Sequence, residues 1–204
     1  MEVSEVTEVF CKWITETQDP SLSLKIERKW SSIYTDNRLL LRKDLYKRFG
    51  HPALLNLDEV PKNLGQNVSI SHCPVYGGYV VSDRPIGFDL EQWKRVSHPL
   101  VKRTCDETEL ILLEDYIEDR AIFWSTKESA YKALRKTEGQ ITEIKLKTIE
   151  KITSLKISNQ EIHLSEGSFY YKVLSHYKKQ SIKTFAFIDH RHDLVGVVSY
   201  PTTL

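Results

Sequence analysis

Two carboxylates, Asp89 and Glu91, stand two residues apart in a segment that alternates between apolar and polar side chains. Ile86, Phe88 and Leu90 form the apolar half of the alternation. Because successive side chains of a strand point to opposite faces, the pattern predicts a strand with its apolar face toward a core and both acids on the other face. Carboxylates roughly 6 to 7 Å apart in this way can bind one hard divalent cation such as Mg²⁺. The alternative is a half-exposed strand whose outer face is merely polar.

A second polar pair, Glu128 and Lys132, lies four residues apart in a segment with helical periodicity. At 100° per residue, Ala130 and Leu134 fall on one side of this helix and the two charged residues on the other. The buried face of the helix is therefore distinct from the face that carries Glu128 and Lys132. The alternative is a surface ion pair that contributes a few tenths of a kcal/mol. Lys127 lies at the edge of the apolar side, where a cation is disfavoured unless its head group meets a partner.

The segments that precede the strand with Asp89 and Glu91 are expected to form a helix and two further strands. The segment from residue 21 to residue 49 has a helical pattern that ends at Gly50, and Asn67–His72 and Tyr79–Val81 read as strands. A short turn joins the second of these strands to the acidic strand, so we expect an antiparallel meander. His72 would then lie near the two acids, with an ordinary surface position as the alternative.

The second half of the chain reads as helix followed by sheet. Asp106 opens a helix, because acidic residues favour a helix N-terminus, and strands are expected in four later segments: 141–146, 156–163 with a turn at Ser158-Asn159, 169–177 and 183–188. The sequence His190-Arg191-His192 is expected to form a polar turn rather than a metal site. The chain lacks a P-loop, a Gly-x-Gly-x-x-Gly and a Gly-x-Ser-x-Gly motif, which excludes the commonest nucleotide-cofactor and hydrolase signatures.

The totals describe an ordinary soluble protein. Its 204 residues are 40% hydrophobic, enough for one large domain or two small lobes. The 29 basic and 28 acidic residues give a net charge of +1 and no bulk attraction for nucleic acid. The acidic N-terminal segment does not resemble a signal peptide, and no stretch has the ~20 apolar residues of a membrane span, so we expect a cytoplasmic protein. The three widely spaced cysteines are expected to be reduced thiols.

Three short motifs follow one another along the chain: Val68-Ser69-Ile70-Ser71-His72, Ile86-Gly87-Phe88-Asp89-Leu90-Glu91, and Trp124-Ser125-Thr126-Lys127-Glu128-Ser129-Ala130-Tyr131-Lys132. In type, order and approximate spacing they resemble the motifs of the 4'-phosphopantetheinyl transferases, specifically the two-lobed surfactin-synthetase-activating (Sfp) type. The family pattern is Phe-Asn-x-Ser-His, Gly-x-Asp-x-Glu and Trp-x-x-Lys-Glu-x-x-x-Lys. The second and third motifs match in full, whereas Val68 and Ser69 replace Phe-Asn in the first. The three together are far more specific than any one alone.

The resemblance implies an α+β fold of two similar lobes related by a pseudo-twofold axis, with the active site in the cleft between them. The lobes would comprise residues 1–84 and 85–204. The implied protein is a monomer. Its implied reaction moves the phosphopantetheine arm of coenzyme A to a serine of an apo acyl or peptidyl carrier protein and releases adenosine 3',5'-bisphosphate.

The resemblance also implies roles for single residues. Asp89, Glu91 and Glu128 would hold Mg²⁺ against the coenzyme A pyrophosphate, a role that suits a cation binding few carboxylates together with substrate phosphates. Glu128, or a water that it orients, would accept the proton of the attacking serine, and Lys132 would pair with phosphate oxygens. The residues that would contact coenzyme A are Ser71, His72, Lys132 and Arg28.

Two other functions compete with this one. A non-catalytic module that binds coenzyme A or a carrier protein would keep the same fold, but it has no need for a complete set of metal and proton ligands. A metal-dependent phosphohydrolase would need a way to position water as the nucleophile, and the sequence offers no feature for it. For the transferase, Lys136, Lys145 and Lys147 are candidates for docking an acidic carrier, with solvated lysines as the alternative.

Overall fold

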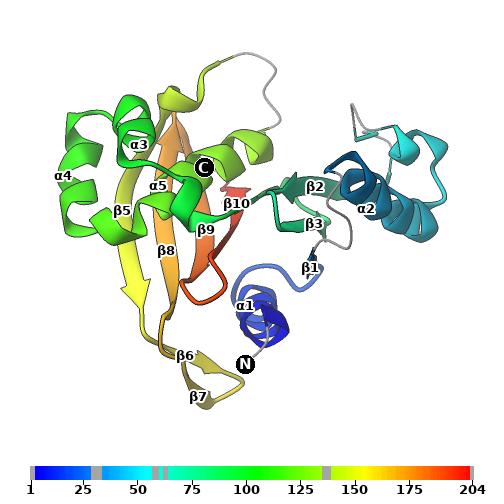
Figure 1. Ribbon diagram of the computed structural model, residues 1–204, viewed down its shortest axis with the longest axis horizontal. Helices are drawn as coiled ribbons and strands as arrows, with labels where there is room; N and C mark the ends of the chain where they lie inside the picture. The colour runs from blue at the N-terminus through cyan, green and yellow to red at the C-terminus, as the bar shows by residue number, and fades with distance from the viewer. Residues whose placement is uncertain (1–2, 29–33, 57–59, 62–63, 135–138, 203–204) are drawn as a thin grey trace.

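The computed structural model describes residues 3–28, 34–56, 60–61, 64–134 and 139–202 (Figure 1). The α-helices are α1 Val3–Thr17, α2 Tyr34–Phe49, α3 His98–Thr104, α4 Glu107–Asp115 and α5 Arg120–Leu134. Short 3₁₀ helices are η1 Pro52–Leu55, η2 Trp93–Arg95, η3 Ile117–Asp119 and η4 Ile141–Glu143. The strands are β1 Ser23–Arg28, β2 Asn67–His72, β3 Tyr76–Ser82, β4 Gly87–Glu91, β5 Ile144–Ile152, β6 Ser154–Ile157, β7 Gln160–His163, β8 Ser168–Tyr177, β9 Gln180–Asp189 and β10 Leu194–Pro201. None of the described helices is long and apolar enough to cross a membrane.

The larger sheet has five antiparallel strands in the order β4-β10-β9-β8-β5. Its side chains alternate between two cores, as the period of two requires. Tyr170, Phe185 and Phe187 belong to the core that contains α1, whereas Tyr171 and Ala186 belong to the core that contains α5. Helices α1 and α5 therefore cover opposite faces of this sheet. The fold is mixed α+β, as predicted.

Strand β4 follows the predicted alternation. Ile86, Phe88 and Leu90 are buried in the core with α1. Asp89 must then point to the opposite face of the sheet, which is the face that α5 covers. This one alternation brings the acids of β4 and the polar side of α5 to the same face.

The smaller sheet has three strands in the order β1-β3-β2. Helix α2 packs on one face of it through Leu41 and Leu45. Residues of the other face, including Tyr76 and Val80, join the core that contains α1 and the larger sheet. Figure 1 shows α2 and this sheet on one side of the molecule and the larger sheet with α3 and α4 on the other. The pseudo-twofold relation and the lobe boundaries stay predictions.

The predicted meander is wrong at its last strand. Strands β2 and β3 pair in antiparallel fashion as predicted, but β4 leaves that sheet and pairs with β10. Serine side chains of β2 close the gap, because the hydroxyls of Ser69 and Ser71 accept hydrogen bonds from the backbone N–H groups of Phe88 (2.9 Å) and Leu90 (3.1 Å). The two sheets thus meet through side chains rather than through a backbone ladder.

The predicted helix from residue 21 to residue 49 is wrong in its first part. Residues Ser23–Arg28 form β1, whose Leu24 and Ile26 pack toward α1 while Lys25 forms ion pairs with Glu27 (2.7 Å) and Asp44 (2.9 Å). A period of two over six residues is too short to be separated from a helical pattern by apolar positions alone. The later part is α2, and Gly50 ends it with a φ of +68°, as predicted.

The strands of the second half are confirmed apart from their ends. The expected strand at 141–146 begins only at Ile144, because Ile141–Glu143 forms η4. Strands β6 and β7 form a hairpin whose turn residues, Ser158 and Asn159, have positive φ angles of 49° and 64°. The residues after β9 form a turn, and Cys11, Cys73 and Cys105 are free thiols, both as predicted.

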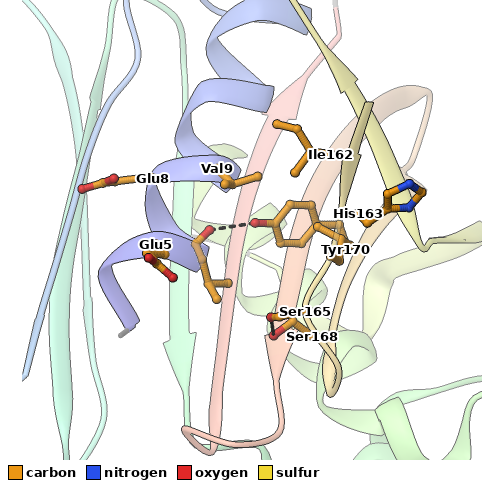
Figure 2. Close-up of a pocket in the computed structure, with 10 residues that line it drawn as sticks. Glu5, Glu8, Val9, Ile162, His163, Ser165, Ser168 and Tyr170 are labelled. Atoms are coloured by element: carbon orange, nitrogen blue, oxygen red, sulfur yellow. Dashed lines mark hydrogen bonds between the residues drawn. The ribbon is translucent and has the colours of Figure 1, made fainter. Parts of the chain in front are cut away.

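A groove of about 360 Å³ runs between α1 and the segment from β7 to β8. Figure 2 shows Tyr170 reaching from β8 to α1, where its hydroxyl donates a 2.7 Å hydrogen bond to the Val6 carbonyl. Val9 and Ile162 lie across the groove from each other. Its lining contains no residue of the three sequence motifs.

Candidate active site

Helix α5 lies directly against β4 because Gly87 has no side chain. Ser129 Oγ donates hydrogen bonds to the carbonyls of Gly87 (2.9 Å) and Val197 (3.3 Å). A Cβ atom at Gly87 would lie 1.8 Å from the Ser129 carbonyl oxygen and 2.5 Å from the Ala133 nitrogen. The glycine of the Gly-x-Asp-x-Glu motif is therefore required for the close approach of these two backbones.

The ammonium group of Lys132 joins the three sequence motifs. Its Nζ lies 2.8 Å from Asp89 Oδ1 and donates to the Phe88 carbonyl at 3.0 Å and to Ser71 Oγ at 3.3 Å. Ser71 Oγ in turn donates to Asp89 Oδ1 at 3.0 Å. Strand β2, strand β4 and helix α5 thus each contribute one polar side chain to a single cluster: Ser71, Asp89 and Lys132.

Glu128 lies one helical turn before Lys132 and is partly buried. Burial raises the pKa of its carboxyl group, the charge of Lys132 lowers it, and Asp89 and Glu91 raise it further. Lys132 makes its ion pair with Asp89, which argues against the alternative of a simple surface pair between Glu128 and Lys132. Because burial is the largest of these effects, the Glu128 carboxyl binds a proton more tightly than an exposed glutamate does.

Glu91 lies at the end of β4, where the chain turns into η2. Its Oε1 accepts a hydrogen bond from the Gln92 N–H at 2.8 Å and lies 3.2 Å from Arg95 Nη1. Burial raises the pKa of the Glu91 carboxyl, the Gln92 hydrogen bond and Arg95 lower it, and Asp89 and Asp193 raise it. The charge of Asp89 therefore acts on Glu91, as expected for two acids on the same face of a strand.

The three carboxylates suit a hard divalent cation in type and charge. Burial raises the pKa of both glutamates, and the negative charge of Asp89 adds to this rise in each of them. Oxygen donors of this kind are the ligands that Mg²⁺ takes. Within the described residues, however, no group of three or more acidic, imidazole or thiol side chains is already gathered around a possible metal position. The donors fit Mg²⁺ chemically, but their side chains would have to turn toward a common point.

Two other predicted residues lie at one end of the smaller sheet. His72 ends β2 and pairs in register with Gly77, and Arg28 ends β1 and pairs with Tyr76. His72 is partly buried and Arg28 is exposed. The two residues lie on opposite edge strands of this sheet, and only His72 shares a strand with Ser71 of the cluster. Among the described interactions Lys132 pairs with Asp89, and Arg28 contacts neither of them.

The lysines expected to dock a carrier protein differ in their surroundings. Lys145 Nζ lies 3.3 Å from Asp106 Oδ2 at the start of α4. Lys147 is exposed on β5, and Lys136 lies outside the described residues. The pairing with Asp106 leaves less of the Lys145 charge for a partner.

Sequence reasoning missed three residues that hold the site together. The Ser69 hydroxyl accepts a hydrogen bond from the Phe88 N–H, and the Ser129 hydroxyl links α5 to β4 through the Gly87 carbonyl. Glu109 forms an ion pair with the buried Lys127. Glu109 had a signal in the sequence, since Asp106-x-x-Glu109 is a capping-box pattern and both of its reciprocal hydrogen bonds are present. The two serines had no signal, because their partners are backbone groups distant in sequence.

The family model of the 4'-phosphopantetheinyl transferase superfamily matches residues 85–188, just over half of the chain. The chain belongs to this superfamily. The match begins just before β4 and ends within β9, so it includes Asp89, Glu91, Glu128 and Lys132. Members of the superfamily are transferases that move phosphopantetheine, with coenzyme A and carrier proteins as their substrates. No curated protein matches the chain.

Proposed function

We propose that this protein is a 4'-phosphopantetheinyl transferase of the two-lobed Sfp type that acts on an apo acyl or peptidyl carrier protein. The contact that carries the proposal is the Lys132 ammonium, which lies 2.8 Å from Asp89 and 3.3 Å from Ser71. It joins residues from before and after the Gly-x-Asp-x-Glu motif at one point. A pseudo-twofold pair of lobes, a cytoplasmic location and a monomeric state belong to the same proposal.

In this proposal Asp89, Glu91 and Glu128 hold Mg²⁺ and Lys132 binds phosphate. When bound, the ion supplies positive charge that offsets the charge on the leaving phosphate oxygen. An anionic substrate phosphate is a competing partner for Lys132, so coenzyme A would draw this ammonium away from Asp89. Ser71, His72 and Arg28 are the proposed contacts of the remaining phosphates.

The transfer itself is a displacement at phosphorus. The oxygen of the carrier serine forms a bond to the phosphorus that bears pantetheine, and the bond between that phosphorus and the bridging pyrophosphate oxygen breaks. Adenosine 3',5'-bisphosphate leaves, and Glu128, or a water that it orients, takes the serine proton. The position of Glu128 supports this role, because it lies one helical turn before Lys132, whose ammonium contacts Asp89.

The test is the intact mass of a panel of apo carrier proteins after incubation with coenzyme A and Mg²⁺. We expect a gain of one phosphopantetheine, about 340 Da, with the wild-type protein. Glu128→Gln should reduce the initial rate by at least ~100-fold, the usual effect of removing a general base. Glu150→Gln is the matched control, because Glu150 is exposed on β5, away from the cluster.

The outcomes separate the competing functions. If no carrier gains mass while coenzyme A still binds, the protein is a binding module. Breakdown of coenzyme A without a carrier would point to a phosphohydrolase. Equal rates for Glu128→Gln and the wild type would remove Glu128 from the reaction but leave the transfer in place.

A further inference from the structure

Lys127 is fully buried, although it is charged and adjoins Glu128. Its Nζ lies 2.7 Å and 3.0 Å from the two carboxylate oxygens of Glu109 and donates a 2.6 Å hydrogen bond to the Ile144 carbonyl. Neither side chain of the pair has any exposed surface. Glu109 also accepts the backbone N–H groups of Leu146 (2.8 Å) and Asp106 (2.9 Å). The pair therefore ties α5 to the start of α4 and the start of β5.

Burial of this ion pair is expected to contribute little to the free energy of unfolding. Removing two charges from water costs several kcal/mol per ion, and apolar residues of similar volume at such positions are often as stable or more stable. The ammonium has three protons, and its three contacts use both oxygens of Glu109 and the Ile144 carbonyl. A buried network in which every polar group has a hydrogen-bond partner favours a single arrangement of its residues. Lys127 is thus suited to hold helix α5 in one orientation.

The position that it fixes is that of Glu128. Lys127 and Ser129 flank Glu128 and project about 100° to either side of it around the helix. Lys127 is anchored to α4 and β5, and Ser129 is anchored to the carbonyls of Gly87 and Val197. With both flanking residues tied to different elements, α5 cannot rotate about its axis without breaking one anchor. Glu128 is held facing the polar cluster.

We propose that the buried Lys127–Glu109 pair is a positioning device that sets the rotation of α5 and so the place of the Glu128 carboxylate. This rests on the proposed function in so far as Glu128 acts in the transfer. Neither residue of the pair touches substrate, since both are enclosed by protein. Their loss should lower kcat and leave the KM for coenzyme A nearly unchanged.

The experiment separates two effects of losing Lys127: the buried Glu109 charge that is left without a cation, and the lost link between α5 and the Ile144 carbonyl. Lys127→Met leaves the Glu109 carboxylate buried without its cation, so it should lower Tm. Adding Glu109→Gln removes that charge and keeps an acceptor for one of the backbone N–H groups, so the double variant should regain much of the lost Tm. The tether to Ile144 is still absent from it. We expect kcat of the double variant to stay about tenfold or more below wild type, with KM for coenzyme A within about twofold.

Thr126→Val is the control. Thr126 is also fully buried in α5, and its hydroxyl has no hydrogen-bond partner among the residues that the structure describes. Its replacement should leave kcat unchanged, because removal of an unpaired buried hydroxyl is nearly neutral. All rates are measured well below the lowest Tm of the set, so that each variant is folded. A double variant with wild-type kcat would overturn the proposal and make the pair purely structural.

Hydrogen exchange gives a readout that does not depend on activity. We expect the amides of α5 from residue 124 to residue 132 to exchange faster in the double variant than in the wild type, with β8 and β9 unchanged. If the wild type transfers no phosphopantetheine, the proposed function fails, and this exchange still decides the positioning role. Unchanged exchange in α5 would overturn it.

Discussion

The Ser71 hydroxyl makes three hydrogen bonds. It accepts from the Leu90 N–H (3.1 Å) and from the Lys132 ammonium (3.3 Å), and it donates to Asp89 (3.0 Å). The Ser69 hydroxyl accepts from the Phe88 N–H at 2.9 Å and lies on the same strand. The two serines make the same kind of backbone contact, but only Ser71 contacts the charged cluster. They form a natural pair for separating stability from activity.

We expect Ser71→Ala and Ser69→Ala to lower the free energy of unfolding by similar amounts, about 1 to 2 kcal/mol each, because each leaves a buried N–H without its acceptor. Only Ser71→Ala should reduce the rate of phosphopantetheine transfer, by roughly tenfold, since only that variant removes a partner of Lys132 and Asp89. Urea unfolding and initial rates provide the measurements. Equal rates for the two variants would contradict a role for Ser71 beyond the strand junction.

At the scale of elements, the packing of α5 on β4 decides the site. The Ser129 carbonyl approaches the Gly87 Cα so closely that no side chain fits between them. A second glycine, Gly77 on β3, differs in what surrounds it. A Cβ there would lie 2.7 Å from Leu41 Cδ1, the end of a side chain that can move. The two glycines thus distinguish contact with a fixed backbone from contact with a flexible side chain.

Gly87→Ala should lower the free energy of unfolding by about 3 kcal/mol, because the methyl group must push α5 away from β4. Transfer should also be lost, since Glu128 and Lys132 move with the helix. Gly77→Ala should cost about 1 kcal/mol or less, because the Leu41 side chain can shift. Thermal and urea unfolding of both variants test this. A Gly87→Ala protein as stable as the Gly77→Ala protein would refute the close approach.

At the scale of the whole molecule, α1 joins the two sheets. Phe10, Trp13 and Ile14 are buried in the core that also contains Tyr76 and Val80 of the smaller sheet. The same core contains aromatic residues of the larger sheet, and Trp13 stacks on Tyr170 with ring centroids 5.5 Å apart. An N-terminal helix therefore contributes to the core of a sheet that begins at β4. Because the sheets share this core, they should lose their structure together.

We expect Phe10→Ala to lower the free energy of unfolding by about 3 to 5 kcal/mol and to keep a single unfolding transition, because its cavity lies in the shared core. Circular dichroism and tryptophan fluorescence should report the same midpoint. Tyr170→Phe is the milder comparison, since it removes only the hydrogen bond to the Val6 carbonyl and should cost about 1 kcal/mol. Two separate transitions in Phe10→Ala would show that the sheets unfold independently.

Local patterns in the sequence were sufficient for several elements. The alternation from Ile86 to Glu91 predicted β4 and the face of its acids, and the helical period around Glu128 predicted α5 and its buried side. The turn at Ser158-Asn159 could be predicted from the sequence, because asparagine is one of the few residues that tolerate a positive φ. These features depend on residues close together in the chain, so the sequence alone contains the information. The family motifs likewise contain Ser71, Asp89 and Lys132, which the structure brings into contact, whereas their roles stay predictions.

Only the tertiary structure decided how those members pair. Lys132 pairs with Asp89 rather than with Glu128, β4 pairs with β10 rather than with β3, and Lys127 finds its partner in Glu109. The helix expected at residues 23–28 is a strand, because β3 lies beside it and supplies a backbone ladder. Each outcome depends on a partner distant in sequence. Such a partner is chosen by the packing of whole elements, and the pattern of one segment does not contain that choice.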